Sequence, residues 1–596
     1  MDDAGYVPLR EYAVIGDGRT AALVSSQGSI DWLCLPDLDS PSTFGAVLDA
    51  KSGGRFSLAP ETPFTVERRY LPDTNVLETT FRTDAGAVRV TDAMLLPSAG
   101  LVPARELARR VEGLSGSVPM RWRVEPRFMY GGRQPKIGHR SGTPVATSGR
   151  DALAVSSWRA GTPVLDETSI GGSYLASEGD EALVVLSAAH GEPMVLPSRT
   201  EAESRLASTT AFWREWSAGR THDGPWREAV IRSALVLKLL IHSPSGAIAA
   251  AGTASLPEQI GGERNWDYRF CWVRDSAMTL HALMQLGCPQ EGESFFWWLL
   301  HASQLTHPHL RVLYRLNGSE RAPETVLPLD GYRGSAPVRI GNAAVDQEQL
   351  DIYGDLLQTA WLYVTAGGAL DSDTGTRLAE IADLICEIWR RPDCGIWEVR
   401  SQPLHFTHSK IMCWVALDRA VRLAERDLIP RAQASRWGRE AEAIRVFVEE
   451  SCWSERVGSY VRSAGSSELD SSLLLAALMD YPSKRDHRLS ATITALRREL
   501  GSGPLLNRYG GEDGLVGREG SFLCCSFWLA DALARAGRVG EATELMEQLL
   551  GLANDVGLYA EEIDPGGGEF LGNLPQGLVH LALINAAVSV GKAQRR

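Results

Sequence analysis

The feature that most constrains the fold is a change in hydrophobic period close to residue 200. Before that point, short runs rich in β-branched and aromatic residues alternate with turn signals such as GDG, QGS and PDT. Examples are YAVIG (Tyr12–Gly16), SIDWLCL (Ser29–Leu35), NVLETTFRT (Asn75–Thr83) and ALVVLSAA (Ala182–Ala189). Many short strands at this spacing indicate an antiparallel arrangement rather than β–α–β units. The pattern predicts an antiparallel β-sandwich over residues 1–200.

The rest of the chain has a helical period. Residues 201–225 begin with EAESRLASTTAFWREWSAG, which predicts a helical linker. From residue 226 to 596 apolar residues recur at helical spacing. Roughly twelve helix candidates begin near Trp226, Arg274, Pro289, Asp346, Asp373, Ser409, Ala432, Ser471, Lys484, Ser521, Val539 and Pro575. The 596 residues are too many for one core, so the sequence predicts a β domain followed by an all-α domain.

Charge and cysteine content exclude several classes of partner. The net charge of −14 argues against nucleic acid or an anionic membrane surface as the main partner. No apolar run approaches the length of a membrane span, and the first residues hold no apolar signal segment. The nine cysteines are odd in number, and Cys524 adjoins Cys525. These features predict a cytoplasmic protein without a disulfide framework.

The stretch NWDYRFCWVRD (Asn265–Asp275) suits the binding of a sugar. It places two tryptophans, a tyrosine and a phenylalanine among two arginines and two aspartates. Aromatic faces pack against the C–H face of a sugar ring, and its hydroxyls form directional hydrogen bonds with guanidinium and carboxylate groups. The alternative is a buried ion-pair cluster at the start of a helix.

This stretch and four others resemble the signatures of glycoside hydrolase family 15, the inverting glucoamylase and trehalase-like enzymes. The preceding SLPEQIGGER (Ser255–Arg264) belongs to the same match, and the opening Tyr6–Pro36 resembles the start of bacterial and archaeal members. The four further stretches follow in the family's order and are Gly331–Asp355, Arg391–Lys410, Glu519–Leu533 and Gly557–Ile584. The resemblance implies an (α/α)6 barrel after a β-sandwich, a multidomain β + α architecture.

The resemblance also implies hydrolysis with inversion, which needs two carboxyl groups. One is protonated and donates to the leaving oxygen, while the other is ionised and activates a water on the opposite face of the ring. Glu398, in GIWEVR, matches the family's acid, and Trp397 matches an aromatic residue of the sugar site. Its apolar neighbours would raise the pKa of the carboxyl group. Without the resemblance, Glu398 beside Arg400 reads more readily as a surface ion pair.

The base falls in an acidic segment close to the C-terminus. Aligning Tyr559–Asp564 with the family's pattern makes Glu561 the base and places Glu562 where the family often has glutamine. This departure leaves open which of the two adjacent glutamates faces the cleft. On composition alone the segment reads as an exposed acidic turn.

Five other residues match the family's substrate-binding positions. Arg274 and Asp275 match the pair that holds the hydroxyls of the terminal glucose. Tyr268 and Trp272 occupy matching aromatic positions, and Arg508 resembles an arginine near the neighbouring subsite. The resemblance needs no cofactor, and no metal site is predicted.

The most consistent interpretation is an inverting α-glucoside hydrolase that acts on a disaccharide or small oligosaccharide. α,α-Trehalose is the first expectation, and maltodextrins or isomalto-oligosaccharides are the alternative. A phosphorylase on the same fold, or an inactive sugar-binding homologue, are rival hypotheses. The sequence leaves a homo-oligomeric assembly open.

Overall fold

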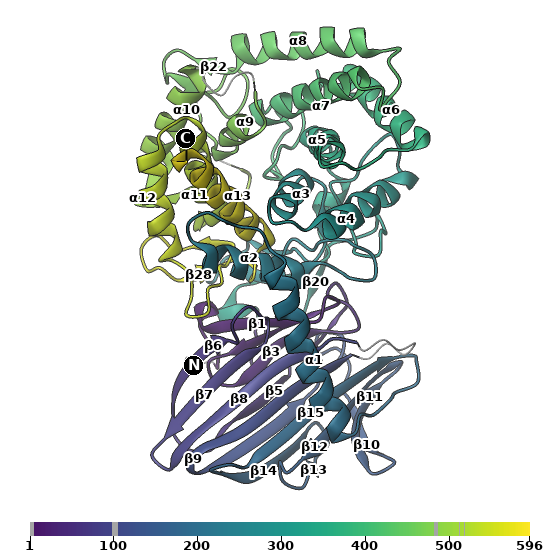
Figure 1. The fold of residues 1–596 in the computed structure, drawn as a ribbon, viewed down its shortest axis with the longest axis vertical. Helices are drawn as coiled ribbons and strands as arrows, with labels where there is room; N and C mark the ends of the chain where they lie inside the picture. The colour runs from purple at the N-terminus through teal and green to yellow at the C-terminus, as the bar shows by residue number, and fades with distance from the viewer. Residues whose placement is uncertain are drawn as a thin grey trace.

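The computed structural model describes residues 5–97, 105–481, 487–511, 513–515, 517 and 519–595. These residues form an N-terminal antiparallel sheet domain followed by a helical domain. In Figure 1 the sheet domain lies below the helical domain. The predicted order, β first and then α, is therefore confirmed. Helix α1 (Arg199–Ala218) leaves the sheet domain and runs along it, with contacts to β8.

The sheet domain contains fifteen strands among the described residues, all paired antiparallel. They are β1 (Tyr12–Gly16), β2 (Ala21–Ser25), β3 (Ser29–Cys34), β4 (Ser42–Phe44), β5 (Arg55–Pro60), β6 (Thr65–Tyr70), β7 (Leu77–Thr83), β8 (Gly86–Leu95), β9 (Glu106–Glu125), β10 (Lys136–Arg140), β11 (Thr143–Ser148), β12 (Asp151–Trp158), β13 (Val164–Leu165), β14 (Ile170–Ser177) and β15 (Glu181–His190). Strand β1 matches its predicted run, and β3, β7 and β15 match theirs within two residues.

Strand β9 joins two groups of strands and departs from the predicted pattern of short strands. Its first half pairs with β8 and β15, and its second half pairs with β5 and β14. The change of partner falls at Gly113–Gly116, where the pairing with β8 contains a bulge. Gly116 has φ +64°, and a Cβ on Gly113 would lie 1.9 Å from the Ser177 carbonyl oxygen. Glycine at these positions lets one long strand serve both groups.

The helical domain contains twelve α-helices between residues 227 and 594 among the described residues. They are α2 (Arg227–Leu240), α3 (Ser276–Gln285), α4 (Pro289–Ala302), α5 (Asp351–Thr365), α6 (Ser372–Ile388), α7 (Thr407–Glu425), α8 (Ala434–Ser451), α9 (Leu475–Leu478), α10 (His487–Leu500), α11 (Leu523–Arg535), α12 (Val539–Leu550) and α13 (Gly577–Gln594). All begin within five residues of the predicted starts, apart from the start at Lys484, which lies outside the described residues.

Short two-stranded pairings decorate the connections between these helices. The strands are β16 (Ala254–Pro257), β17 (Asn265–Asp267), β18 (Cys271–Trp272), β19 (Leu313–Tyr314), β20 (Thr325–Leu327), β21 (Val338–Ile340), β22 (Trp453–Ser454), β23 (Ser459–Tyr460), β24 (Gly501–Ser502) and β25 (Leu505–Leu506). A three-stranded sheet of β26 (Ser521–Phe522), β27 (Glu562–Ile563) and β28 (Phe570–Leu571) completes the set.

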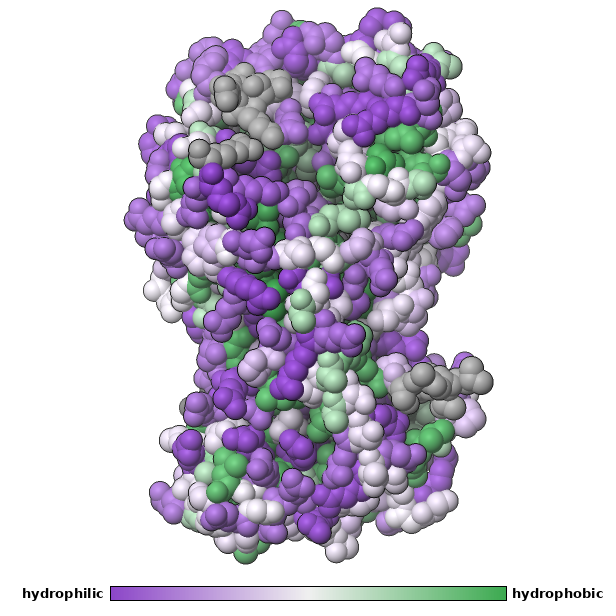
Figure 2. Space-filling model, in the orientation of Figure 1, coloured by the Kyte–Doolittle hydropathy of each residue, from purple (hydrophilic) through white to green (hydrophobic). Residues whose placement is uncertain are grey.

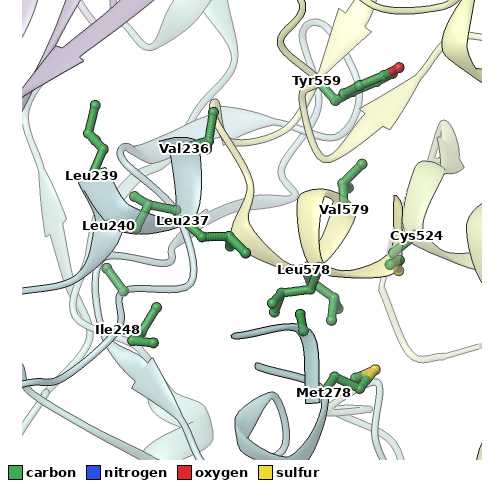
Figure 3. Close-up of a cluster of buried hydrophobic side chains, with 14 of the residues drawn as sticks. Val236, Leu237, Leu239, Leu240, Ile248, Met278, Cys524, Tyr559, Leu578 and Val579 are labelled. Carbon is green, nitrogen blue, oxygen red and sulfur yellow. The ribbon is translucent and has the colours of Figure 1, made fainter. Parts of the chain in front are cut away.

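Alternate helices contact one another in a closed cycle. Helix α3 packs on α5, α5 on α7, α7 on α9, α9 on α11, α11 on α13, and α13 again on α3. The other helices lie against this cycle; α2 contacts α13, and α12 contacts α11 and α13. Figure 3 shows apolar side chains of α2, α3 and α13 in the buried core.

A buried arginine from the helical domain ties the two domains together. Arg269 donates to both carboxylate oxygens of Asp267, at 2.8 and 2.6 Å. It also donates across the junction to the Ser40 carbonyl oxygen at 2.7 Å and to the Tyr130 hydroxyl at 2.8 Å. Both charged side chains are almost fully buried. Because this arginine belongs to the stretch Asn265–Asp275, the sheet domain fixes the segment that leads into α3.

We expect Arg269→Met to lower the free energy of unfolding by about 3–5 kcal/mol, because it leaves the Asp267 carboxylate buried without its partner. Urea denaturation followed by circular dichroism measures this change. Arg315→Met is the matched control, because Arg315 bonds Asp39 across the same junction at 2.8 Å while its side chain is 37% exposed. The control should change the free energy by less than about 1 kcal/mol. Equal effects of the two substitutions would contradict the role given to burial.

The surface shown in Figure 2 is mostly hydrophilic, with small hydrophobic patches and a narrower waist where the two domains meet. Among the described residues, no helix combines the length and the apolar character needed to cross a bilayer.

Candidate active site

Glu398 lies in the connection between α6 and α7, and its backbone is held in an unusual conformation. Its φ is +57°, a left-handed value that is uncommon outside glycine. The Glu398 amide donates to the Gly395 carbonyl oxygen, and Gln347 donates to the Glu398 carbonyl oxygen at 3.1 Å. Asp393 anchors the start of the connection by accepting from the Leu350 amide at 2.9 Å. The loop is therefore fixed at both its start and its turn.

Two side chains of the stretch Asn265–Asp275 meet the Glu398 carboxyl group. Trp272 donates from Nε1 to Oε1 at 2.5 Å, and Arg274 donates from Nη1 to the same oxygen at 3.2 Å. Burial raises the pKa of Glu398, whereas Arg274 and the hydrogen bond from Trp272 lower it. The net direction is upward, which favours the protonated form that a general acid requires.

We expect Trp272→Phe to extend activity to higher pH. The substitution keeps an aromatic ring but removes the donor that stabilises the ionised carboxylate, so the pKa of Glu398 rises further. A general acid is lost as pH rises through its pKa, so the alkaline limb of kcat/KM should move upward. The pH dependence of kcat/KM measures this. Trp528→Phe is the control, because this indole is also buried but contacts the Trp397 ring rather than Glu398. A limb that moves downward in the Trp272 variant would contradict the assignment.

Glu561 and Glu562 are adjacent but lie in different parts of the backbone, because Glu561 is in a bend that precedes strand β27. Strand β27 begins at Glu562 and is paired with both β26 and β28. The Glu561 backbone is held by the Leu523 amide, at 3.1 Å from its carbonyl oxygen, and by the Asn573 carbonyl oxygen. The two carboxyl groups therefore have different surroundings.

The Glu561 carboxyl group is buried, with only 1% of the residue exposed. Its Oε2 accepts from the Asn573 amide at 3.0 Å, while Oε1 has no hydrogen-bond partner among the described residues. Gly572 has φ +70°, and a Cβ there would lie 2.5 Å from Oε2, so only glycine leaves room for this carboxylate. Burial and the nearby Glu258 raise the pKa of Glu561 to about 8.

Glu398 and Glu561 line the same cavity. Tyr268, Arg274 and Asp275 line it as well, and so do Trp397, Arg508 and Gln576. A second cavity adjoins it and shares Tyr268, Trp397, Glu398 and Arg508. Eight of the nine predicted site residues thus gather here, seven in the lining and Trp272 through its bond to Glu398. Glu562 is not among the lining residues of either cavity.

Asp275 and Trp397 are held within this lining by further polar contacts. Arg274 donates from Nε to Asp275 at 3.1 Å. Trp397 donates from Nε1 to Asp470 at 2.8 Å, and the Arg508 guanidinium lies 5.6 Å from the centre of its ring. Aromatic faces and charged groups are thus presented to one enclosed space, an arrangement that suits a sugar ring.

Arg508 is surrounded by carboxylates. It donates from Nε to Glu519 at 2.9 Å and from Nη2 to Glu258 at 3.1 Å, and Glu562 Oε1 lies 3.8 Å from Nη2. Among the described residues, Glu258, Glu519 and Glu562 form the one trio of acidic groups with oxygens within 4.8 Å of one another. Because the Arg508 guanidinium already lies among these oxygens, we interpret the trio as a clamp that holds this arginine.

Several residues of the site were not predicted from the sequence. Glu258 contacts Arg508, Gln347 supports the Glu398 backbone, and Trp266 lines the second cavity beside Arg264. Glu258 lies inside the stretch Ser255–Arg264, so its place in a signature of the family was the available signal. Gln347 carries no comparable signal.

A helical domain with two glutamates, aromatic residues and an Arg–Asp pair around one cavity defines a carbohydrate-cleaving enzyme of the glycoside hydrolase class. Comparison with known families makes this specific. The model of "Glycosyl hydrolases family 15" matches residues 224–588, and "Trehalase-like, N-terminal" matches residues 3–213. The chain belongs to glycosyl hydrolases family 15.

Curated relatives and a solved structure agree with this placement. The chain is 39% identical to the trehalase of Mycobacterium tuberculosis over 99% of this chain and 90% of that protein. It is 35% identical to the trehalase of Thermoplasma volcanium over 99% of this chain and 94% of that protein. A bacterial glucoamylase complexed with acarbose has the same fold, with a TM-score of 0.72 and 14% identity over 99% of this chain and 95% of that one.

Proposed function

We propose that the protein hydrolyses α,α-trehalose with inversion, releasing glucose. Glu398 is the general acid, Glu561 is the general base, and Arg274 with Asp275 holds the glucose unit whose bond is cleaved. The observation that carries the proposal is that both glutamates line one cavity together with this Arg–Asp pair. The relatives named trehalase support the choice of substrate.

We assign the reacting oxygens from the hydrogen bonds that each carboxyl group already makes. Trp272 and Arg274 both donate to Glu398 Oε1, so Oε2 carries the proton that passes to the glycosidic oxygen. The Asn573 amide occupies Glu561 Oε2, so Oε1 accepts the proton of the attacking water. The water oxygen bonds to the anomeric carbon as the bond to the leaving oxygen breaks, which inverts the configuration. Neither transfer needs a cofactor.

We assign one ring of the disaccharide to each of the two adjoining cavities. The inner cavity contains Glu561 and the Arg274–Asp275 pair, and the outer one contains Trp266, Asn342 and Gln347. Glu398 lines both, as the acid must if it lies at the bond between the rings. Cleavage of maltodextrins or isomalto-oligosaccharides is the alternative within the same chemistry, and it requires further subsites beyond the outer cavity.

We infer the finer architecture and setting from the same features. The closed cycle of helices and the helices outside it support an (α/α)6 barrel over residues 226–596, and the two groups of strands joined by β9 support a β-sandwich over residues 1–200. Residues 201–225 are then the linker. All nine cysteines are free thiols, eight of them buried, which is consistent with the predicted cytoplasmic location.

Anomer-resolved proton NMR of the purified protein tests the proposal. With trehalose as substrate we expect equimolar α- and β-glucose to appear first, because inversion converts only the unit attacked by water. Maltose, isomaltose and panose are run in parallel. Glucose release only from these three would overturn the substrate assignment, and turnover only with added inorganic phosphate would identify a phosphorylase. No turnover on any of them would favour the inactive homologue.

A further inference from the structure

We propose that Glu258 is a positioning residue that controls the charge on Glu561 by holding Arg508 and by competing with Glu561 for a proton. The inference rests on the proposed function of Glu561 as the general base. It adds a residue that neither the family signatures nor the relatives' names assign to the reaction.

Glu258 is buried beside Arg508 and is held on both sides. Its backbone amide donates to the Arg264 carbonyl oxygen at 3.0 Å. Its Oε2 accepts from Arg508 Nη2 at 3.1 Å, and only 1% of the residue is exposed. Arg508 itself lines both cavities. Glu258 therefore connects the fixed end of β16 to a guanidinium that faces the substrate space.

The groups around Glu258 hold more negative than positive charge. The cations are Arg508 and Arg264. The carboxylates that contact them or lie beside them are Glu258, Asp513, Glu519, Glu561 and Glu562. Asp513 is paired with Arg264, which donates to both carboxylate oxygens of Asp513 at 2.7 and 3.0 Å. One guanidinium, Arg508, is left to balance the remaining carboxylates, of which Glu519 is shared with Arg264.

Three carboxylate oxygens in this cluster have no hydrogen-bond partner among the described residues. They are Oε1 of Glu258, of Glu561 and of Glu562. Like charges that are buried together cannot all stay ionised, so the cluster retains protons. Glu562 is fully buried and its pKa is raised well above the usual value, so it holds one.

Glu258 and Glu561 then compete for a further proton. Burial is the main cause of the raised pKa of each group, which reaches about 7 for Glu258 and about 8 for Glu561. Glu258 is the first charged neighbour that raises the pKa of Glu561, ahead of Glu519, while Arg508 lowers it. When Glu258 is ionised, Glu561 is protonated and cannot accept a proton from water. When Glu258 takes the proton, Glu561 ionises and becomes the base.

The test is the pH dependence of kcat/KM for trehalose in the Glu258→Gln variant. The substitution keeps the size of the side chain but removes its negative charge, so the pKa of Glu561 falls. A general base is active above its pKa, and the acid limb should therefore move down by at least about one pH unit. At a pH well below the acid limbs of both proteins, kcat/KM of the variant should exceed that of the wild type about ten-fold. Circular dichroism and thermal melting confirm that the variant is folded.

Two further variants separate this effect from a structural one. Glu258→Asp keeps the charge but withdraws it from Arg508, so KM should rise while the acid limb stays in place. Glu541→Gln removes a carboxylate from α12, where it contacts Arg497 and Arg538, and should leave both KM and the limb unchanged.

An acid limb in Glu258→Gln that coincides with that of the wild type would overturn the inference. If Glu258→Gln does not fold, Glu258→Asp decides the question. An acid limb that moves, or a KM equal to that of the wild type, would then contradict the inference. Failure of the proposed function would appear in the wild-type protein itself, which would then release no glucose from trehalose.

Discussion

Glu398→Gln is expected to lower kcat for trehalose by at least ~10²-fold while the protein stays folded. Glutamine accepts the hydrogen bonds of Trp272 and Arg274 through its carbonyl oxygen, so the geometry around Oε1 is kept. It cannot supply the proton that the leaving glucose unit needs. Steady-state kinetics with purified protein measures the loss, and KM should change little because the cavity keeps its shape.

The leaving group provides the control for this variant. α-Glucosyl fluoride releases fluoride, which needs far less help from an acid than a sugar alkoxide does. The Glu398→Gln enzyme should therefore retain much more of its activity on the fluoride than on trehalose. Equal losses on both substrates would contradict the role of Glu398 as proton donor and indicate a defect in binding or folding.

The sequence predicted the helices and strands well where the hydrophobic period and the family signatures agreed. The change of period near residue 200 separated the sheet domain from the helices, and apolar spacing located the helix starts because each helix buries one face. The length of β9 was not predicted. Its change of partner depends on Gly113 and Gly116, which are needed because Ser177 and Ala85, distant in the chain, approach closely there.

The site residues likewise divide into those that the sequence predicted and those that it did not. Tyr268, Arg274 and Glu398 were found by matching residue types to a family pattern, and they line one cavity in the structure. Glu258 and Gln347 were missed because their roles depend on contacts that span 250 and 51 positions of sequence. The choice between Glu561 and Glu562 was also beyond the sequence, since it depends on which of the two adjacent carboxyl groups reaches the cavity.

Glu561→Gln is expected to lower kcat by at least ~10²-fold on trehalose and on α-glucosyl fluoride alike, because the attacking water loses its base whatever the leaving group. This common loss separates the base from the acid. Glu562→Gln is the matched control. Glu562 is fully buried, its Oε2 accepts from the Gly520 amide at 2.8 Å, and its raised pKa keeps it neutral, so an uncharged glutamine resembles it closely. That variant should retain activity within about three-fold. Of the two adjacent glutamates only Glu561 lines the cavity. A large loss in Glu562→Gln with normal turnover in Glu561→Gln would therefore transfer the base to Glu562.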